Sequence, residues 1–109
     1  DEKTMEFEYA KCGMIGLQTC FAVINTILPT LSDTQLIQLF STNARRIFSL
    51  PSAGIEEGLP AEFSIYKRNG NFVFDEKENY SRSKNSAFFG KKLNGSIKGI
   101  FAKNKHTIF

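Results

Sequence analysis

The chain has 109 residues, of which 41% are hydrophobic, 23% charged and 13% aromatic, and its formal net charge is +3. This composition is typical of one folded domain and excludes a disordered chain. No apolar run approaches the ~20 residues that a membrane-spanning helix needs, so we expect no membrane partner. No secretory signal opens the chain, and Cys12 and Cys20 are too few for a disulfide scaffold, which favours a cytoplasmic protein.

The chain begins with Asp1 instead of an initiator methionine, which predicts that it is part of a longer protein. Its single histidine, His106, lies close to the end. A zinc site or a cysteine–histidine nucleophile pair therefore lacks the residues it needs. We expect these residues to hold no metal and no cofactor and to be inactive alone.

The charge is distributed unevenly along the chain. Residues 1–62 carry a net charge of −4, and residues 63–109 carry a net charge of +7. The basic residues occur as scattered pairs such as Lys67-Arg68 and Lys91-Lys92, without a basic stripe or an aromatic RNA-binding motif. Lysines along solvated strand edges explain this distribution, so we expect no nucleic-acid partner.

The first half of the chain has helical patterns. Residues 14–28 carry apolar side chains at the spacing of one helix face, and Pro29 ends the pattern. Ser32 and Gln35 have the spacing of a capping box, which predicts a second helix over residues 33–41. The expected core-facing residues of the first helix are Leu17, Phe21, Ile24 and Leu28.

A third, short helix is predicted over residues 43–48, because Ser41-Thr42-Asn43 can cap a new turn and Pro51 follows. The first helix is apolar on almost all sides, so it needs neighbours on more than one side. The strands predicted below have open edges as well. We therefore expect the chain to form a homo-oligomer.

The second half has the alternation of strands. It predicts a strand over residues 62–67, a hairpin turn at Asn69-Gly70 and a returning strand over 72–74. Further strands are predicted over 97–102 and 107–109.

Residues 75–95 are polar and predict an extended excursion between strands. Its run from Ser81 to Ser86 can bind an anion, but the favoured interpretation is a loop that satisfies its own backbone, with Phe88 and Phe89 as anchors. The chain as a whole is therefore α+β, with a seam near residues 50–60.

Four stretches in this order resemble the C-terminal part of a dihydroorotase, a cyclic amidohydrolase of the metal-dependent hydrolase superfamily. Together they span residues 12 to about 101. The stretches are Cys12-Gly13-Met14-Ile15-Gly16-Leu17-Gln18-Thr19, Ser41-Thr42-Asn43-Ala44-Arg45-Arg46-Ile47-Phe48, Gly54-Ile55-Glu56-Glu57-Gly58-Leu59-Pro60-Ala61-Glu62-Phe63, and Ser83-Lys84-Asn85-Ser86-Ala87-Phe88-Phe89-Gly90 with Leu93-Asn94-Gly95.

The resemblance implies a fold and a reaction. Residues 1–50 would be helices from the end of a (β/α)8 barrel, and residues 51–109 would be strands of the small C-terminal β-sandwich. The parent would be a zinc enzyme of pyrimidine biosynthesis that cyclises N-carbamoyl-L-aspartate reversibly to L-dihydroorotate. Its zinc ligands would lie upstream of residue 1. Cys12 and Gly13 would match the pair whose backbone holds the substrate carboxylate.

Three positions depart from the family pattern and keep alternatives open. Cys12 stands where the family has Phe, Lys11 where it usually has Pro, and Glu62 where it has Asp. One alternative is a metal-free dihydroorotase-like scaffold that partners aspartate transcarbamoylase. Another is a related hydantoinase or allantoinase.

Overall fold

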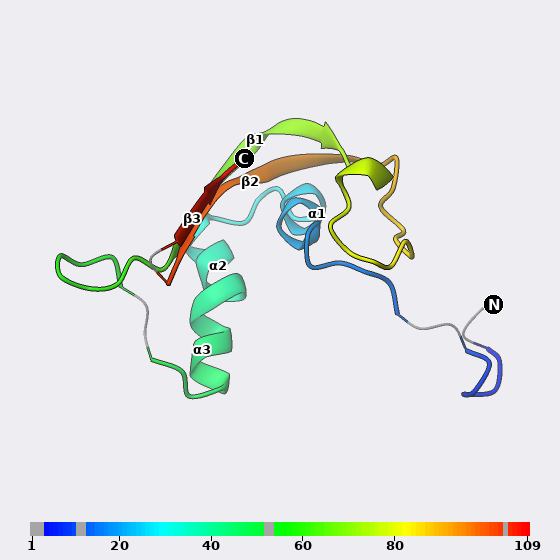
Figure 1. The fold of residues 1–109 in the computed structure, drawn as a ribbon, viewed down its shortest axis with the longest axis horizontal. Helices are drawn as coiled ribbons and strands as arrows, with labels where there is room; N and C mark the ends of the chain where they lie inside the picture. The colour runs from blue at the N-terminus through cyan, green and yellow to red at the C-terminus, as the bar shows by residue number, and fades with distance from the viewer. Residues whose placement is uncertain (1–3, 11–12, 52–53, 104) are drawn as a thin grey trace.

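The computed structural model describes residues 4–10, 13–51, 54–103 and 105–109. Helices lie beneath one antiparallel three-stranded sheet with the strand order β1-β2-β3 (Figure 1). This mixed arrangement agrees with the predicted α+β class. The elements are α1 (Cys20–Ile27), α2 (Asp33–Ile37), the π-helical turn η1 (Gln38–Thr42), α3 (Asn43–Ile47), β1 (Phe63–Val73), the 3-10 turn η2 (Glu76–Glu78), β2 (Lys92–Ala102) and β3 (Lys105–Ile108).

The helix predicted over residues 14–28 begins later, at Cys20. Residues 13–16 are outside any helix or strand, because glycines at 13 and 16 weaken helix formation and the Ile15 amide donates to the distant carbonyl of Asn85. A turn then leads into α1, with the Thr19 amide donating to the Gly16 carbonyl at 3.1 Å. The start of the predicted helix is therefore wrong by about two turns.

The face that α1 buries also differs from the prediction. Leu17 precedes the helix and is 96% exposed, whereas Ala22 and Asn25 are the buried residues of α1. Small and polar side chains at these positions let the helix lie close beneath β2. Phe21 packs on another side of α1, with its ring 5.1 Å from that of Tyr66 and 6.2 Å from that of Phe40.

The capping box at the start of α2 is confirmed. The Gln35 amide donates to the Ser32 hydroxyl at 3.2 Å, and the Ser32 amide donates to the Gln35 side chain at 2.8 Å. The short helix predicted over residues 43–48 is confirmed as α3, but its predicted cap is absent: Thr42 makes no side-chain cap, and η1 joins α2 to α3 without a break.

The hairpin predicted at Asn69-Gly70 is also wrong, because β1 continues through it. Lys67 pairs with Ser96 and Asn71 with Asn94, so residues 68–70 lie opposite Gly95 alone. The turn-forming residues therefore build a bulge of three residues instead of reversing the chain. The strand that pairs with β1 is β2 and not the predicted segment 72–74. β2 begins at Lys92, five residues before the strand predicted over residues 97–102.

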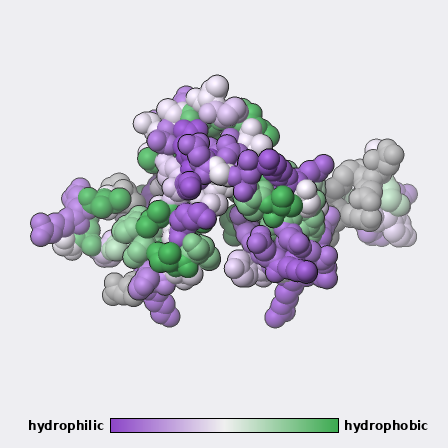
Figure 2. Space-filling view, turned by 90° about the horizontal axis from the view of Figure 1, so that it is seen from above, coloured by the Kyte–Doolittle hydropathy of each residue, from purple (hydrophilic) through white to green (hydrophobic). Residues whose placement is uncertain are grey.

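The core of the described residues is small. Ala22, Phe74 and Leu93 form one buried cluster, against which four partly buried residues pack: Val23, Phe72, Phe88 and Phe89. The radius of gyration is 16.5 Å, whereas a compact chain of this length has about 13 Å. Hydrophobic residues consequently reach the surface between hydrophilic ones (Figure 2).

The helical run from α2 to α3 exposes most of its large apolar side chains. Ile47 and Phe48 are 71% and 73% exposed, and Ile37 and Leu39 are about half exposed. In Figure 1 this run hangs below one end of the sheet. None of the described helices has the length and apolar character required to cross a bilayer.

Candidate functional site

The segment 13–16, which precedes α1, is held by a loop that lies far away in the sequence. The Ile15 amide donates to the Asn85 carbonyl at 2.9 Å, and the Asn85 side-chain amide donates to the Gly13 carbonyl at 3.3 Å. One residue of the loop thus bonds on both sides of Met14. This contact joins the first and the last of the four dihydroorotase-like stretches.

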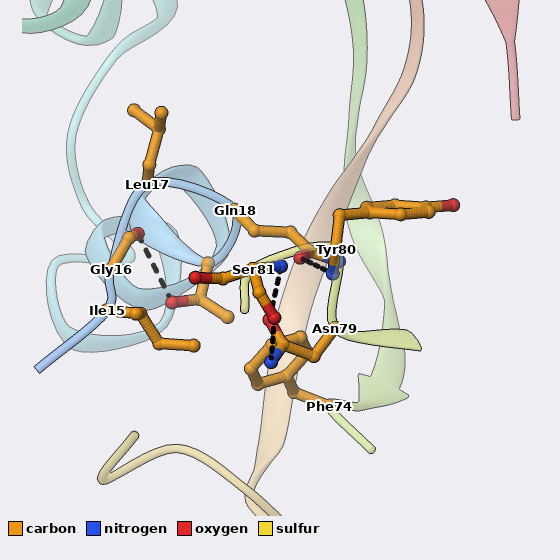
Figure 3. Close-up of a pocket in the computed structure, with 9 residues that line it drawn as sticks. Ile15, Gly16, Leu17, Gln18, Phe74, Asn79, Tyr80 and Ser81 are labelled. Atoms are coloured by element: carbon orange, nitrogen blue, oxygen red, sulfur yellow. Dashed lines mark hydrogen bonds between the residues drawn. The ribbon is translucent and has the colours of Figure 1, made fainter. Parts of the chain in front are cut away.

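Gln18 makes a second contact between the same two parts of the chain. Its side-chain nitrogen donates to the Glu78 carbonyl at 2.6 Å, and its side-chain oxygen accepts from the Tyr80 amide at 3.1 Å. Figure 3 shows the Gln18 side chain reaching across to the backbone at Tyr80, while Leu17 points away. Gln18 therefore pairs with the loop backbone much as a neighbouring strand would.

The loop that makes these contacts orders its own backbone through short polar side chains. The Asn79 side chain donates to the carbonyls of Ser81 and Ser83 at 3.1 and 2.8 Å. The hydroxyl of Ser83 accepts from the Asn85 amide at 3.3 Å. The prediction that this polar run satisfies its own backbone is confirmed.

The base of the loop is fixed to the core by aromatic packing. The rings of Phe74 and Phe89 stack with their centres 4.9 Å apart, and the Gly90 amide donates to the Phe74 carbonyl at 2.9 Å. Phe74 is 1% exposed. Phe88 and Phe89 both pack against the buried cluster, which confirms their predicted role as anchors.

A hollow of about 410 Å³ lies between the two parts (Figure 3). One wall comes from residues before α1 and the other from the loop, and Phe74 lines it as well. Its walls are mainly apolar. The lining residues are Ile15, Gly16, Leu17, Gln18, Thr19, Phe74, Asn79, Tyr80 and Ser81.

The two residues that the resemblance assigns to substrate binding have different outcomes. Cys12 lies outside the described residues. Gly13 is exposed, and a β-carbon built on it would meet no atom within 4 Å. A ligand can therefore approach the backbone at Gly13 closely from this side.

The other candidate groups of the sequence do not form a reactive cluster in the described part of the chain. Cys20 is an exposed thiol at the start of α1, and the His106 ring stacks on Phe101 at 5.4 Å in the sheet. Among the described residues, no three His, Cys, Asp or Glu side chains lie close enough to hold a metal ion. These residues do not fit a zinc centre.

A polar cluster at the β1 bulge was not expected from the sequence. The Arg68 guanidinium donates to Asn25 at 3.1 Å, to Asp33 at 3.3 Å and to the Pro29 carbonyl at 3.4 Å. The Tyr66 hydroxyl donates to the same Asp33 carboxylate at 3.2 Å. Burial raises the pKa of the Tyr66 phenol above 10.0, and the bond to Asp33 raises this pKa further.

Sequence patterns gave little indication that Asn25 and Gln18 make long-range hydrogen bonds. Both lie in a stretch that reads as an apolar helix, where a polar residue is ordinarily a solvated one. The available indication for Asn25 was its position between Ile24 and Ile27, since a lone amide among apolar residues needs a partner when it is buried.

Comparison with known proteins gives a consistent result. A scan against models of protein families finds no match. The chain is 36% identical over 100 residues to the dihydroorotase of Acetivibrio thermocellus, which covers 89% of this chain and 24% of that protein. It is 35% identical over 108 residues to the dihydroorotase of Clostridium acetobutylicum, which covers 96% of this chain and 26% of that protein.

A third relative, the dihydroorotase of Elusimicrobium minutum, is 34% identical over 103 residues, 92% of this chain and 24% of that protein. The chain therefore spans about a quarter of the length of these curated relatives. Such coverage agrees with a C-terminal dihydroorotase segment. The resemblance that the four motifs indicated is confirmed: over nearly its whole length, this chain is similar to a segment of the dihydroorotases.

Proposed function

We propose that the parent of this chain is a zinc dihydroorotase, which cyclises N-carbamoyl-L-aspartate reversibly to L-dihydroorotate in pyrimidine biosynthesis. The observation that carries this proposal is the similarity to three dihydroorotases over 89–96% of the chain. The substrate is a small anion, and the reaction suits a cytoplasmic enzyme.

Within this parent, the 109 residues are a non-catalytic segment. The described residues hold no metal-binding cluster, so the zinc that activates water in such a reaction would be held by residues outside them. What this chain contributes is the backbone at Cys12 and Gly13, which would bind the substrate carboxylate. The open space beside Gly13 supports this role, since a carboxylate can reach its backbone.

We further propose that residues 1–50 belong to a barrel domain and residues 51–109 to a β-domain. Two observations support this division. The run from α2 to α3 exposes apolar side chains such as Ile47 and Phe48, as expected of helices that pack on further chain. The sheet has only three strands, and both outer strands, β1 and β3, have a free edge within the described structure.

The test is the activity of the full-length parent. We expect the purified parent to contain zinc and to interconvert the two substrates, and we expect the 109-residue chain alone to bind no stoichiometric zinc and to have no activity. A parent that contains zinc but acts on hydantoin or allantoin would replace the proposed substrate with that of a related amidohydrolase.

A second candidate function is favoured by the presence of Cys12 where dihydroorotases have Phe. In this case the parent is a metal-free scaffold that binds aspartate transcarbamoylase. Metal analysis separates the two functions, because the scaffold would contain no zinc. Copurification with the transcarbamoylase would then identify the partner.

A further inference from the structure

The backbone at Gly13 and Met14 is oriented from outside its own segment. Residues 13–16 belong to no helix or strand, and their long-range hydrogen bonds run to the loop that follows η2. A segment with so little support of its own samples many conformations unless another part of the chain fixes it. In this structure the residue that fixes it is Asn85.

The geometry of these bonds determines which way the peptide between Gly13 and Met14 faces. The Asn85 side chain donates to the Gly13 carbonyl at 3.3 Å, and the Asn85 carbonyl accepts from Ile15 at 2.9 Å. In a trans peptide the carbonyl and the N–H point in opposite directions. The bond to the Gly13 carbonyl therefore turns the Met14 N–H to the side away from Asn85.

The loop is suited to hold this orientation because it is itself fixed. Asn79 bonds to the loop backbone at 2.8 Å and 3.1 Å, and the loop ends on the buried Phe74 through the Phe89 stack. Gln18 fastens the same loop a second time, through the backbone at Glu78 and Tyr80 (Figure 3).

We propose that Asn85 is a positioning residue, which sets the peptide between Gly13 and Met14 so that its N–H meets the carboxylate of the substrate. Gln18 holds the same loop through its hydrogen bonds to the backbone of Glu78 and Tyr80. This inference rests on the proposed function, because it assumes that the substrate carboxylate binds at Gly13, and it adds the N–H of the next residue, Met14, as a donor. Neither side chain is assigned a contact with the reacting atoms.

The test uses the full-length parent with Asn85→Ala and, as an independent variant on the other side of the contact, Gln18→Ala. Asn85→Ala removes one hydrogen bond to the binding backbone, and Gln18→Ala removes two that hold the loop. We expect each variant to raise KM by about tenfold. We expect kcat to stay within about threefold, because the zinc centre is untouched. The matched control is Ser86→Ala, since the Ser86 hydroxyl bonds within the loop, to the Phe88 amide at 3.1 Å.

Hydrogen exchange provides a readout besides activity. The amide of Ile15 should exchange faster in Asn85→Ala than in Ser86→Ala, because the segment is released. An active wild-type parent with equal KM values for Asn85→Ala, Gln18→Ala and Ser86→Ala would overturn the positioning role alone. A wild-type parent that does not turn over dihydroorotate would overturn the proposed function and, with it, the substrate role of Asn85.

Discussion

Asn25 in α1 and Arg68 in the β1 bulge exchange hydrogen bonds in both directions. The Asn25 amide donates to the Arg68 carbonyl at 2.9 Å, and the Arg68 guanidinium donates to the Asn25 side-chain oxygen at 3.1 Å. The same amide also donates to the Asn94 carbonyl at 2.9 Å. One buried side chain of a helix thus satisfies backbone groups of both long strands at the point where their pairing is interrupted.

The first prediction concerns the removal of this link. Asn25 is 2% exposed, so Asn25→Ala leaves two strand carbonyls without their partner. We expect the free energy of unfolding to fall by about 1–3 kcal/mol. Urea unfolding at one fixed protein concentration measures it, with Asn69→Ala as the control, because Asn69 is an exposed asparagine in the same bulge. Equal losses for the two variants would contradict the role of Asn25.

The second prediction concerns the residue opposite the bulge. A β-carbon at Gly95 would lie 2.7 Å from the Asn25 side-chain nitrogen and 3.0 Å from two backbone carbonyls. Gly95 also has a φ of +86°, and Gly90 has a φ of +72° but nothing within 4 Å. Gly90→Ala should therefore cost only the left-handed conformation, about 1–2 kcal/mol.

Gly95→Ala should cost the same conformational term and, in addition, about 1–3 kcal/mol for the steric overlap. The two variants separate the conformational cost from the steric cost, because both glycines have a positive φ and only Gly95 is enclosed by other atoms. Thermal or urea unfolding of the two variants provides the measurement. A Gly95→Ala variant that is as stable as Gly90→Ala would show that the bulge adjusts without cost.

Local sequence patterns predicted some of these elements and not others. The capping box at Ser32 depends on residues three apart, and the structure confirms it. The prediction of a hairpin turn at Asn69-Gly70 was wrong, because a turn motif determines only the local backbone conformation. Here the Arg68 side chain donates hydrogen bonds to Asn25, Asp33 and Pro29, which are distant in sequence. These contacts favour a bulge, and β1 continues past it.

The candidate site was predictable only in part, for a similar reason. The sequence identified the polar loop and its Phe88 and Phe89 anchors from local composition. It did not identify the contact of Asn85 with Gly13, because these residues are 72 positions apart and no periodicity links them. The resemblance placed both residues in dihydroorotase-like stretches, but it did not place the stretches next to each other.

The third prediction concerns pH. Burial and then the bond to Asp33 raise the pKa of Tyr66 above 10.0. A raised pKa means that the neutral phenol contributes stability, which is fully present below pH 10 and is lost as pH rises through the pKa of the folded state. The wild type should therefore lose stability as the pH rises above 10, and the Tyr66→Phe variant should lose less. Identical alkaline unfolding of the variant and the wild type would refute this.

A companion variant identifies the cause of the shift. Asp33→Asn keeps the burial of Tyr66 and removes the carboxylate that accepts the hydrogen bond of its hydroxyl. We expect the phenol to titrate at a lower pH in Asp33→Asn than in the wild type, because the contribution of Asp33 is lost while Arg68, which lowers this pKa, remains. Phenolate absorbance, with Tyr66→Phe to identify the band, measures both values.

The fourth prediction tests substrate binding by the backbone in the full-length parent. Gly13→Val should raise KM more than Cys12→Ala, because a β-carbon at Gly13 fills the space through which a carboxylate would reach the backbone. A β-carbon built at Gly13 meets no atom of the described chain within 4 Å, so the substitution enters open space. Equal losses of kcat/KM in the two variants would count against backbone binding.

The last prediction concerns self-association of the isolated 109-residue chain. The described residues bury few apolar side chains, and Ile47 and Phe48 are 71% and 73% exposed on the run from α2 to α3. Burying an apolar side chain is worth about 1.5–3 kcal/mol, and a domain of this size has a net stability of only about 5–15 kcal/mol. Several such side chains left in water are therefore a large cost.

Self-association removes this cost, and a symmetric dimer is the commonest closed solution. We expect a dimer or a higher oligomer at micromolar concentration, with α1, the run from α2 to α3 or a sheet edge at the contact, measured by sedimentation equilibrium. If the helical run forms the contact, Phe48→Asp should shift the equilibrium toward monomer. Ile55→Asp should not, although Ile55 is 84% exposed, because it lies in the loop before β1. A monomeric wild type with slow amide exchange throughout α1 would show that the chain closes its own core, and self-association would then be wrong.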